Sequence, residues 1–445
     1  DRRGVVVSTR RIERLEIEGL FGRFNYTIDL SVKEGSLKIL TAPNGYGKST
    51  ILRAIDALAR GDYKYFARER FNNIKFFLSD ESMVEIIRKD DGVSINYGEK
   101  SVIINGGEHG GKRRTFFNSS VADLKKVASR ILFEGRERNT VEKERFFELY
   151  DDIQSSVKFL KQESWLEEVR ESLSVLSIST NRLKSDIPRL SERSDNEFEN
   201  AFTVDFLAEV VKTKIRQEIG RQFNKGRQLE ASFPARLIEA IREPALSPQK
   251  SSVAEAINLV KDYEARFAKL GLVPKTGSEA KIKSFKMDSL EGPGVIVLET
   301  YLGDILTKFT LLDELARKLE VFCDSINELL AFKTVSTSAD DGIIVRVSDR
   351  EDESVPLNLL SSGEQHLIVI IGELVFNADE DSLVLIDEPE ISFHPEWQER
   401  FIGILEKIQQ VNSFSVLVST HSPMLIGDRW DRVIELSSQY EGGKG

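Results

Sequence analysis

The sequence is poor in residues that cross-link a chain or anchor it in a membrane. Its 445 residues contain one cysteine, Cys323, which excludes an internal disulfide framework, a C-x-x-C zinc hook and any cysteine-rich metal site. No apolar run approaches the roughly 20 residues of a membrane span, and no stretch resembles a signal peptide. These absences predict a cytoplasmic protein without membrane partners. The sequence opens on Asp1 rather than on Met, which leaves the natural start open.

The charge balance is acidic. Asp and Glu number 73 against 62 Lys and Arg, and the resulting net charge of −11 argues against broad non-specific DNA binding. DNA is a possible partner, but the net charge gives no indication of DNA binding. We interpret the basic clusters as solvated loop charge rather than nucleic-acid contacts: Arg2-Arg3, Arg10-Arg11 and Lys112-Arg113-Arg114. The length exceeds a single core, so two or three domains are expected.

Residues 36–55 show the order of strand, glycine loop and helix that a phosphate-binding loop requires. The loop's backbone N–H groups and the helix N-terminus would point at the β- and γ-phosphates. Lys48 adds a positive charge there, and the Ser49 hydroxyl can ligate Mg²⁺. Ala42 replaces the first glycine of the usual pattern, which is a mild change. The predicted nucleotide contacts are Asn44, Gly45, Tyr46, Gly47, Lys48, Ser49 and Thr50.

The regions on either side of the loop alternate apolar and polar residues. Residues 12–30 predict an antiparallel pair, in which Phe24 or Tyr26 could stack on a nucleotide base, although core packing is the better interpretation. Short strands over 74–78, 83–88 and 92–97 predict a small meander, and residues 121–169 have a helical pattern. The apolar run 173–178 ends in Ser179-Thr180-Asn181-Arg182, either a ligand-contacting cluster or a turn.

The middle of the chain has helical periodicity. Apolar residues recur at three and four positions from Leu207 onwards, and we predict a helical arm over residues 194–330 that the chain leaves by and returns along. A compact helical subdomain is the alternative. One helix over about 295–330 would be roughly 50 Å long. Breaks are expected at Phe233-Pro234, Glu243-Pro244, Pro248 and Pro274.

The last part returns to α/β character. Residues 342–347 predict a strand, and Ser361-Ser362-Gly363-Glu364-Gln365 precedes an apolar helix. That polar stretch is either a plain capping box or an anion-contacting turn. Residues 397–408 predict a further helix and 415–419 a further strand. His421 follows that strand, as a turn histidine or as a contact to the γ-phosphate.

The apolar strand 383–386 ends in two adjacent carboxylates, Asp387 and Glu388. Such a run is typical of a parallel strand covered on both faces. Asp387 at its tip suits Mg²⁺ coordination beside Ser49. Glu388 is then placed to orient or deprotonate the attacking water, so that Lys48, Glu388 and His421 form the predicted catalytic set.

Together these motifs resemble the ABC-type ATPases, more narrowly the RecF, SMC and OLD (overcoming lysogenization defect) branch. The resemblance covers about residues 11–184 and 331–437, through APNGYGKST, LSSGEQ, LVLIDEPE with ISFHP, and VSTHSP. It implies an α/β fold: an ABC-type P-loop ATPase head, with a mixed sheet, helices and antiparallel strands, interrupted by a helical or coiled-coil arm. The implied domains are an N-terminal lobe (1–193), the arm (194–330) and a C-terminal lobe (331–445).

In that family the signature helix of one subunit covers the ATP held by the other. The resemblance therefore implies ATP and Mg²⁺ as ligands and a head-to-head homodimer, or a higher homo-oligomer. The signature residues that would contact nucleotide are Ser361, Ser362, Gly363 and Glu364, the last three in trans. The family's Q-loop glutamine has no clear match, and Arg182 in Thr180-Asn181-Arg182 occupies the comparable place.

Departures from the family narrow the expectation. The chain stops soon after His421, so no TOPRIM nuclease domain is expected, and SMC arms are far longer. The pattern is similar to stand-alone OLD-like ATPase subunits of anti-phage systems of the PARIS or Septu type. There the ATPase responds to a phage-encoded trigger and controls a separate effector, a nuclease or toxin. The competing hypotheses are a RecF/SMC-like DNA-repair or DNA-clamping ATPase and a module that binds ATP with little turnover.

Overall fold

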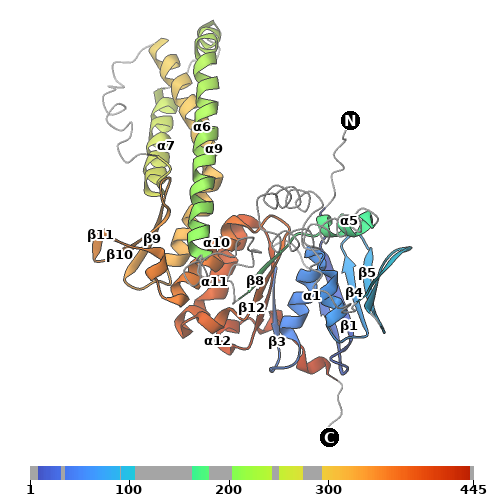
Figure 1. The fold of residues 1–445 in the computed structure, drawn as a ribbon. Helices are drawn as coiled ribbons and strands as arrows, with labels where there is room; N and C mark the ends of the chain where they lie inside the picture. Colours follow the sequence, from blue (N-terminus) through green and yellow to red (C-terminus); the bar gives the residue numbers. More distant parts are fainter. Residues whose placement is uncertain are drawn as a thin grey trace, which may run out of the picture. The chain divides into compact units, whose positions relative to one another are not determined.

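The computed structural model describes residues 9–31, 36–90, 92–105, 163–179, 203–242, 250–273 and 293–440. The chain divides into two compact units. The first combines residues 1–180 with 378–445, and the second consists of residues 181–377. The first unit therefore joins the blue beginning and the red end of the chain (Figure 1). Residues 331–377, expected in the C-terminal lobe, lie in the second unit.

A five-stranded parallel sheet forms one layer of the first unit. Its order is β14-β3-β13-β12-β8. The central strands are apolar and buried on both faces, as parallel strands covered by other elements are. Ile39, Leu385 and Val418 are at most 1% exposed. The strands are β3 (Leu37–Thr41), β8 (Val175–Ser179), β12 (Leu383–Asp387), β13 (Ser415–Thr420) and β14 (Val433–Glu435).

A six-stranded antiparallel sheet forms the second layer, in the order β2-β1-β4-β5-β6-β7. The predicted N-terminal pair and the predicted meander are confirmed, and pairing of β1 with β4 joins them into one sheet. Strand β7 was not predicted. The strands are β1 (Ile12–Leu20), β2 (Phe24–Asp29), β4 (Asn73–Leu78), β5 (Met83–Lys89), β6 (Gly92–Tyr97) and β7 (Lys100–Asn105).

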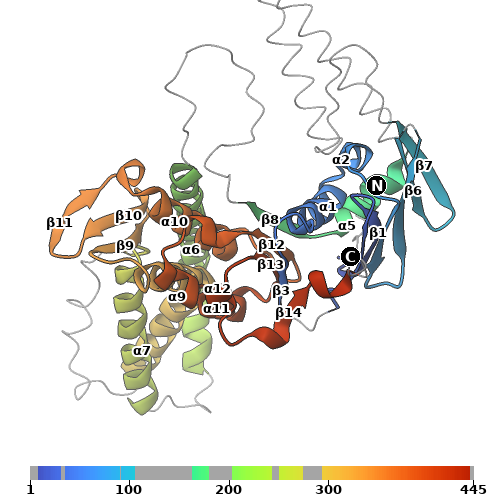
Figure 2. The ribbon, with the colours of Figure 1, turned by 90° about the horizontal axis from the view of Figure 1, so that it is seen from below.

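Helix α1 (Lys48–Arg60) lies between the two sheets (Figure 2), and its apolar face contributes Ile51, Leu52 and Ile55 to their shared core. Helices α2 (Tyr63–Arg68) and α5 (Ser164–Ser172) complete that core through Phe66 and Trp165. The unit also contains η5 (Pro389–Ser392), α11 (Pro395–Asn412), α12 (Pro423–Ile426), η6 (Trp430–Arg432) and η7 (Ser437–Gln439).

Three long helices dominate the second unit: α6 (Thr203–Arg242), α7 (Lys250–Lys269) and α9 (Pro293–Asn327). Both α6 and α7 pack along α9. A three-stranded antiparallel sheet lies at one end of this bundle, against α6 and α9 (Figure 2). It consists of β9 (Lys333–Ser338), β10 (Gly342–Val347) and β11 (Arg350–Val355), and is followed by η4 (Leu357–Leu359) and α10 (Ser362–Phe376). None of the described helices is both long and apolar enough to cross a lipid bilayer.

One predicted helix break is wrong. Helix α6 continues through Pro234 rather than stopping at Phe233-Pro234. Proline removes one helical hydrogen bond, but side chains support this turn. Arg236 Nη2 donates to the Leu229 carbonyl at 2.9 Å, and Arg236 also makes two hydrogen bonds to Asp304 on α9, at 2.6 and 2.7 Å. The bond to Leu229 spans the proline within α6, and the bonds to Asp304 hold α6 against α9 just after it. Tertiary packing therefore outweighs the local signal.

Several predicted features lie outside the described residues. They include Thr180-Asn181-Arg182, with the candidate ligand Arg182, most of the helical pattern over 121–169, and the basic clusters Arg2-Arg3 and Lys112-Arg113-Arg114.

Candidate nucleotide-binding site

The candidate site lies at the carboxyl ends of three neighbouring strands in the first unit. Thr41, the last residue of β3, pairs with Thr420 of β13, and Asp387 of β12 pairs with Ser419 of β13. Parallel strands end at the same edge of a sheet, where ligands of open α/β sheets bind. The glycine loop after β3, the two carboxylates at the end of β12 and His421 after β13 therefore meet at one edge.

The loop has the backbone that its glycines predict. Gly45 and Gly47 both have φ of +88°, in the left-handed region that favours glycine. A Cβ on Gly47 would lie 2.7 Å from Leu20 Cδ2, whereas a Cβ on Gly45 would meet nothing within 4 Å. Gly47, at the N-cap of α1, has no side chain that could cap the helix, and the first turn of α1 contains no acidic residue. The first N–H groups of α1 thus have no acidic competitor from that turn, as an anion site requires.

Phe24 and Tyr26 are buried core residues, as preferred from the sequence, and they support the loop. Tyr26 Oη donates to the Tyr46 carbonyl at 2.9 Å. The Phe24 ring lies 5.7 Å from that of Tyr26 and 5.2 Å from that of Tyr46, centre to centre. The hydrogen bond from Tyr26 and the ring contact with Phe24 therefore hold Tyr46 in place within the loop.

Lys48 opens α1 and is only 5% exposed. Its Nζ donates to the Ala42 carbonyl at 3.0 Å and lies 2.5 Å from His421 Nε2. Burial lowers the pKa of Lys48, and the nearby carboxylates of Glu388, Asp387 and Glu390 partly oppose that effect by favouring the charged amine.

Asp387 lies beside Ser49, as predicted. Its Oδ1 accepts a hydrogen bond from Ser49 Oγ at 3.1 Å and another from Ser419 Oγ at 2.5 Å. Mg²⁺ prefers oxygen ligands, and in phosphate sites it takes one or two from protein and the rest from phosphate and water. Ser49 and Asp387 fit that requirement. No cluster of three or more His, Cys, Asp or Glu side chains within the described ranges is arranged as a metal site of its own.

Glu388 adopts a left-handed backbone conformation, with φ of +47° and ψ of +56°. This conformation is costly for a residue with a side chain and tends to occur at functional sites. The Glu388 N–H donates to the Ser419 carbonyl at 2.9 Å, which ties the residue to β13. Its Oε1 lies 3.2 Å from His421 Nε2.

His421 therefore contacts both Lys48 and Glu388 through the same ring nitrogen. Nε2 can accept from the ammonium when the ring is neutral, or donate to the carboxylate when it carries the proton, but it cannot do both at once. Whether Nε2 carries a proton therefore decides whether His421 forms a hydrogen bond with Lys48 or with Glu388.

The signature stretch lies in the second unit, at the start of α10. Ser361 caps that helix in a capping box: its Oγ accepts from Glu364 N at 3.3 Å, and its own N–H donates to Glu364 Oε2 at 2.8 Å. Lys333 Nζ donates to both Glu364 oxygens at 2.7 and 2.8 Å. Burial by itself raises the pKa of Glu364, but hydrogen bonds from Lys333 and Ser361 lower it below its usual value. Ser362 and Gly363 occupy the first turn between these anchors.

The structure thus brings the predicted loop residues, Asp387, Glu388 and His421 together in the first unit, and Ser361 to Glu364 in the second. Two further residues of the site had no predicted role. Ser419 bonds to Asp387, and Glu390 accepts from Thr420 Oγ1 and His421 N at 2.6 and 2.7 Å. Glu390 lies in the motif LVLIDEPE and Ser419 in VSTHSP, but only the folded strands show which groups they contact.

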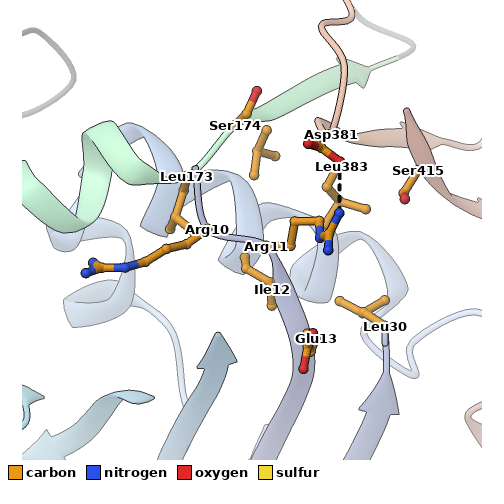
Figure 3. Close-up of a pocket in the computed structure, with 11 residues that line it drawn as sticks. Arg10, Arg11, Ile12, Glu13, Leu30, Leu173, Ser174, Asp381, Leu383 and Ser415 are labelled. Carbon is orange, nitrogen blue, oxygen red and sulfur yellow. Dashed lines mark hydrogen bonds and ion pairs between the residues drawn. The ribbon is translucent and has the colours of Figure 1, made fainter. Parts of the chain in front are cut away.

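A separate small pocket lies at the opposite edge of the parallel sheet (Figure 3). It is lined by Val175, Leu383 and Ser415, the first residues of β8, β12 and β13, and the ion pair of Arg11 Nη1 with Asp381 Oδ1, at 2.8 Å, lies beside them. Its volume of about 20 Å³ is room for roughly one water molecule. A nucleotide does not fit there.

The family described as "AAA domain, putative AbiEii toxin, Type IV TA system" matches residues 43–427. Among curated proteins, Protein ea59 of Escherichia phage lambda is 34% identical over 67 residues, which are 15% of this chain and 13% of ea59. The chain therefore spans only a small part of that relative.

Two similar solved structures are SMC head domains. The head with an extended coiled coil, bound to the C-terminal domain of ScpA and derived from Pyrococcus furiosus, has a TM-score of 0.40 at 12% identity, covering 96% of this chain and 93% of that one. The head from Thermotoga maritima has a TM-score of 0.35 at 11% identity, covering 94% and 91%.

Proposed function

The chain belongs to this AAA-domain family, and from its site we propose that it is an ATP-binding and ATP-hydrolysing ABC-type ATPase. In this proposal two copies dimerise head to head, and the nucleotide cycle controls a separate effector protein. The observation that carries the proposal is the meeting of the phosphate loop with the carboxylates of β12. Ser49 Oγ and Asp387 Oδ1 lie 3.1 Å apart although 338 positions separate the two residues.

The loop and the first turn of α1 would bind the ATP phosphates through residues 44–50. Lys48 already has its Nζ at this edge, where it would exchange the Ala42 carbonyl and His421 for phosphate oxygens. Ser49 and Asp387 would hold Mg²⁺. The ion supplies charge neutralisation at the β- and γ-phosphates.

Glu388 would act as the general base. Its carboxylate would accept a proton from the attacking water, and its backbone bond to Ser419 keeps it at the end of β12. Once Lys48 turns to phosphate, His421 is free to donate a hydrogen bond to the γ-phosphate. The contact of His421 with both Lys48 and Glu388 supports this exchange.

The signature residues Ser362, Gly363 and Glu364 would complete the site of a second copy, and Ser361 would be a further nucleotide contact. The capping box and Lys333 hold this turn in a defined shape before any partner arrives. In this view residues 331–445 function as the C-terminal lobe of the head, with 194–330 as the arm and 1–193 as the N-terminal lobe. Arg182 would be a further nucleotide contact.

We place the protein in bacterial anti-phage defence, in the cytoplasm, with a nuclease or toxin as effector and a phage-encoded trigger. Support comes from the family description, which names a type IV toxin–antitoxin system, and from the OLD-like motifs. The RecF/SMC-like DNA-clamping alternative would need a basic surface, and the net charge of −11 gives it little support.

The first test compares phosphate release by wild type, Glu388→Gln and Lys48→Ala, with Glu399→Gln as the control because Glu399 is an exposed glutamate on α11. Glu388→Gln should bind ATP, accumulate as an ATP-dependent dimer on size exclusion and lose about 10²-fold or more in turnover. Lys48→Ala should lose ATP binding. Equal phosphate release by wild type and Glu388→Gln would refute hydrolysis by this site.

The second test captures tagged Glu388→Gln from its host with ATP present. A stoichiometric nuclease or toxin supports the effector proposal. DNA recovered with repair proteins, and no effector, would support the DNA-clamping alternative instead.

A further inference from the structure

We propose that Glu390 is a positioning residue that fixes the backbone of His421 and thereby sets where the histidine ring lies between Lys48 and Glu388. The proposal rests on the ATPase function argued above. In the part of the chain that the structure describes, the Glu390 side chain makes hydrogen bonds to Thr420 and His421 and none to the phosphate loop or Asp387, so its action is expected to pass through His421.

The side chain of Glu390 joins the two segments that carry Glu388 and His421. A single oxygen, Oε1, accepts from Thr420 Oγ1 at 2.6 Å and from the His421 backbone N–H at 2.7 Å. Thr420 is fully buried at the end of β13, and its Oγ1 also accepts from Ser422 N at 3.0 Å. Three consecutive residues around the histidine are therefore connected to one carboxylate oxygen.

Gln398 on α11 closes the same network from the other side. Its Oε1 accepts from Ser422 Oγ at 2.6 Å, and its Nε2 donates to the backbone carbonyls of Glu390 and Phe393 at 3.4 and 3.1 Å. The histidine segment is thus held to η5 through the Glu390 side chain and through Gln398. Because η5 begins directly after Glu388, this ring of bonds fixes the base and the histidine relative to each other.

The two side-chain oxygens of Glu390 differ in their contacts. Oε2 is buried, and within the described ranges it has no hydrogen-bond partner. A buried carboxylate oxygen without a partner costs folding free energy. The side chain therefore acts on the histidine segment through Oε1, which accepts from Thr420 Oγ1 and from the His421 backbone N–H.

A rival explanation is that Glu390 acts by charge, because its carboxylate also interacts electrostatically with Lys48. The two routes predict opposite behaviour of two conservative variants. Glu390→Gln keeps an oxygen at the same distance that can accept both donors but removes the charge. Glu390→Asp keeps the charge but is one methylene shorter, so that it cannot reach both donors.

The experiment measures kcat and KM for ATP in the full chain. Glu390→Gln should keep at least half of the wild-type kcat, whereas Glu390→Asp and Glu390→Ala should lose about tenfold, with KM changed by less than about twofold, as expected for a contact made in the transition state. Glu399→Ala serves as the matched surface control. If Glu390→Gln lost kcat while Glu390→Asp kept it, the positioning role would be overturned in favour of a role of the charge. If both variants kept the wild-type kcat, Glu390 would have no role in turnover.

A double-variant cycle tests whether the effect passes through the histidine. In a His421→Ala background, Glu390→Asp should cost less than about twofold, because the ring that it positions is absent. An equal tenfold loss in both backgrounds would overturn the proposal. Wild-type turnover no higher than that of Glu388→Gln would instead refute the ATPase function, and the inference with it. Melting temperatures of all variants identify any that fail to fold. If Glu390→Ala does not fold, the comparison of Glu390→Gln with Glu390→Asp still decides between the two explanations.

Discussion

The ion pair between Lys333 and Glu364 should contribute measurably to stability, and Lys333→Met tests that contribution. The lysine donates to both carboxylate oxygens, at 2.7 and 2.8 Å, and the two side chains are 26% and 13% exposed. Hydrogen bonds to charged groups contribute about 1.5–3 kcal/mol each in mutational series. Partial solvent screening reduces the value, and the Ser361 donors remain, so we expect a loss of about 1–2 kcal/mol.

The loss should depend on pH in a defined direction. The pKa of Glu364 is below its ordinary value of 4.5 in the folded protein. A group with a lowered folded pKa stabilises the protein above its unfolded pKa, and this contribution disappears as pH falls through the folded pKa. The difference between wild type and Lys333→Met should therefore be full at pH 7 and should narrow as the pH is lowered from about 5 towards 3.

Thermal or urea unfolding monitored by circular dichroism measures the effect, with an expected decrease in melting temperature of about 2–8 °C at pH 7. Lys318→Met is the matched control, because Lys318 is similarly exposed (28%) but pairs at 3.5 Å with Glu314, which is 85% exposed. Lys318→Met should lower the free energy of unfolding by less than about 0.5 kcal/mol. Equal losses in the two variants, or a Lys333→Met loss that does not change with pH, would refute the reasoning.

Two further predictions concern the second unit. Burial lowers the pKa of His366, so below pH 6.5 the unfolded chain binds more protons than the folded protein, and the free energy of unfolding should fall there. In a profile of melting temperature between pH 8 and 5, His366→Leu should therefore show a smaller decrease than wild type. An equal decrease in the two proteins would contradict this prediction. Gly342 has φ of +75°, and a Cβ there would lie 1.9 Å from the Ala208 carbonyl oxygen, so Gly342→Ala should cost more than about 3 kcal/mol in urea unfolding. Gly98→Ala, at φ of +58° with open space around its Cβ, should cost about 1–2 kcal/mol, and similar losses at the two positions would argue against the steric explanation.

Local patterns were sufficient to predict the elements that carry the candidate nucleotide site. The phosphate loop, the β12 carboxylates and His421 each stand at a strand end that the apolar run before it defines. The rule that parallel strands end at one edge then brings them together, as the 3.1 Å contact of Ser49 with Asp387 confirms. The helices of the arm followed from their periodicity in the same way.

Features that depend on contacts between distant segments were not predictable. The path of α6 through Pro234 depends on Arg236 and Asp304, which lie 68 positions apart. The joining of β1 with β4 depends on long-range pairing, and the contacts of Glu390 exist only once β13 has formed beside β12. Residue types alone do not distinguish Glu390 from any other glutamate in an acidic chain.

The order of the parallel sheet has a consequence for how the protein is made. Strand β3 carries the phosphate loop, yet both of its neighbours, β13 and β14, come from residues 415–435. During synthesis β3 leaves the ribosome with neither edge paired, and its partners follow only after residues 181–377 have been translated. Unpaired apolar edges associate with other chains. Translation that stops before Ser415 would therefore yield a chain whose phosphate-loop strand lacks both partners, and such products should aggregate or be degraded rather than persist as free ATP-binding fragments.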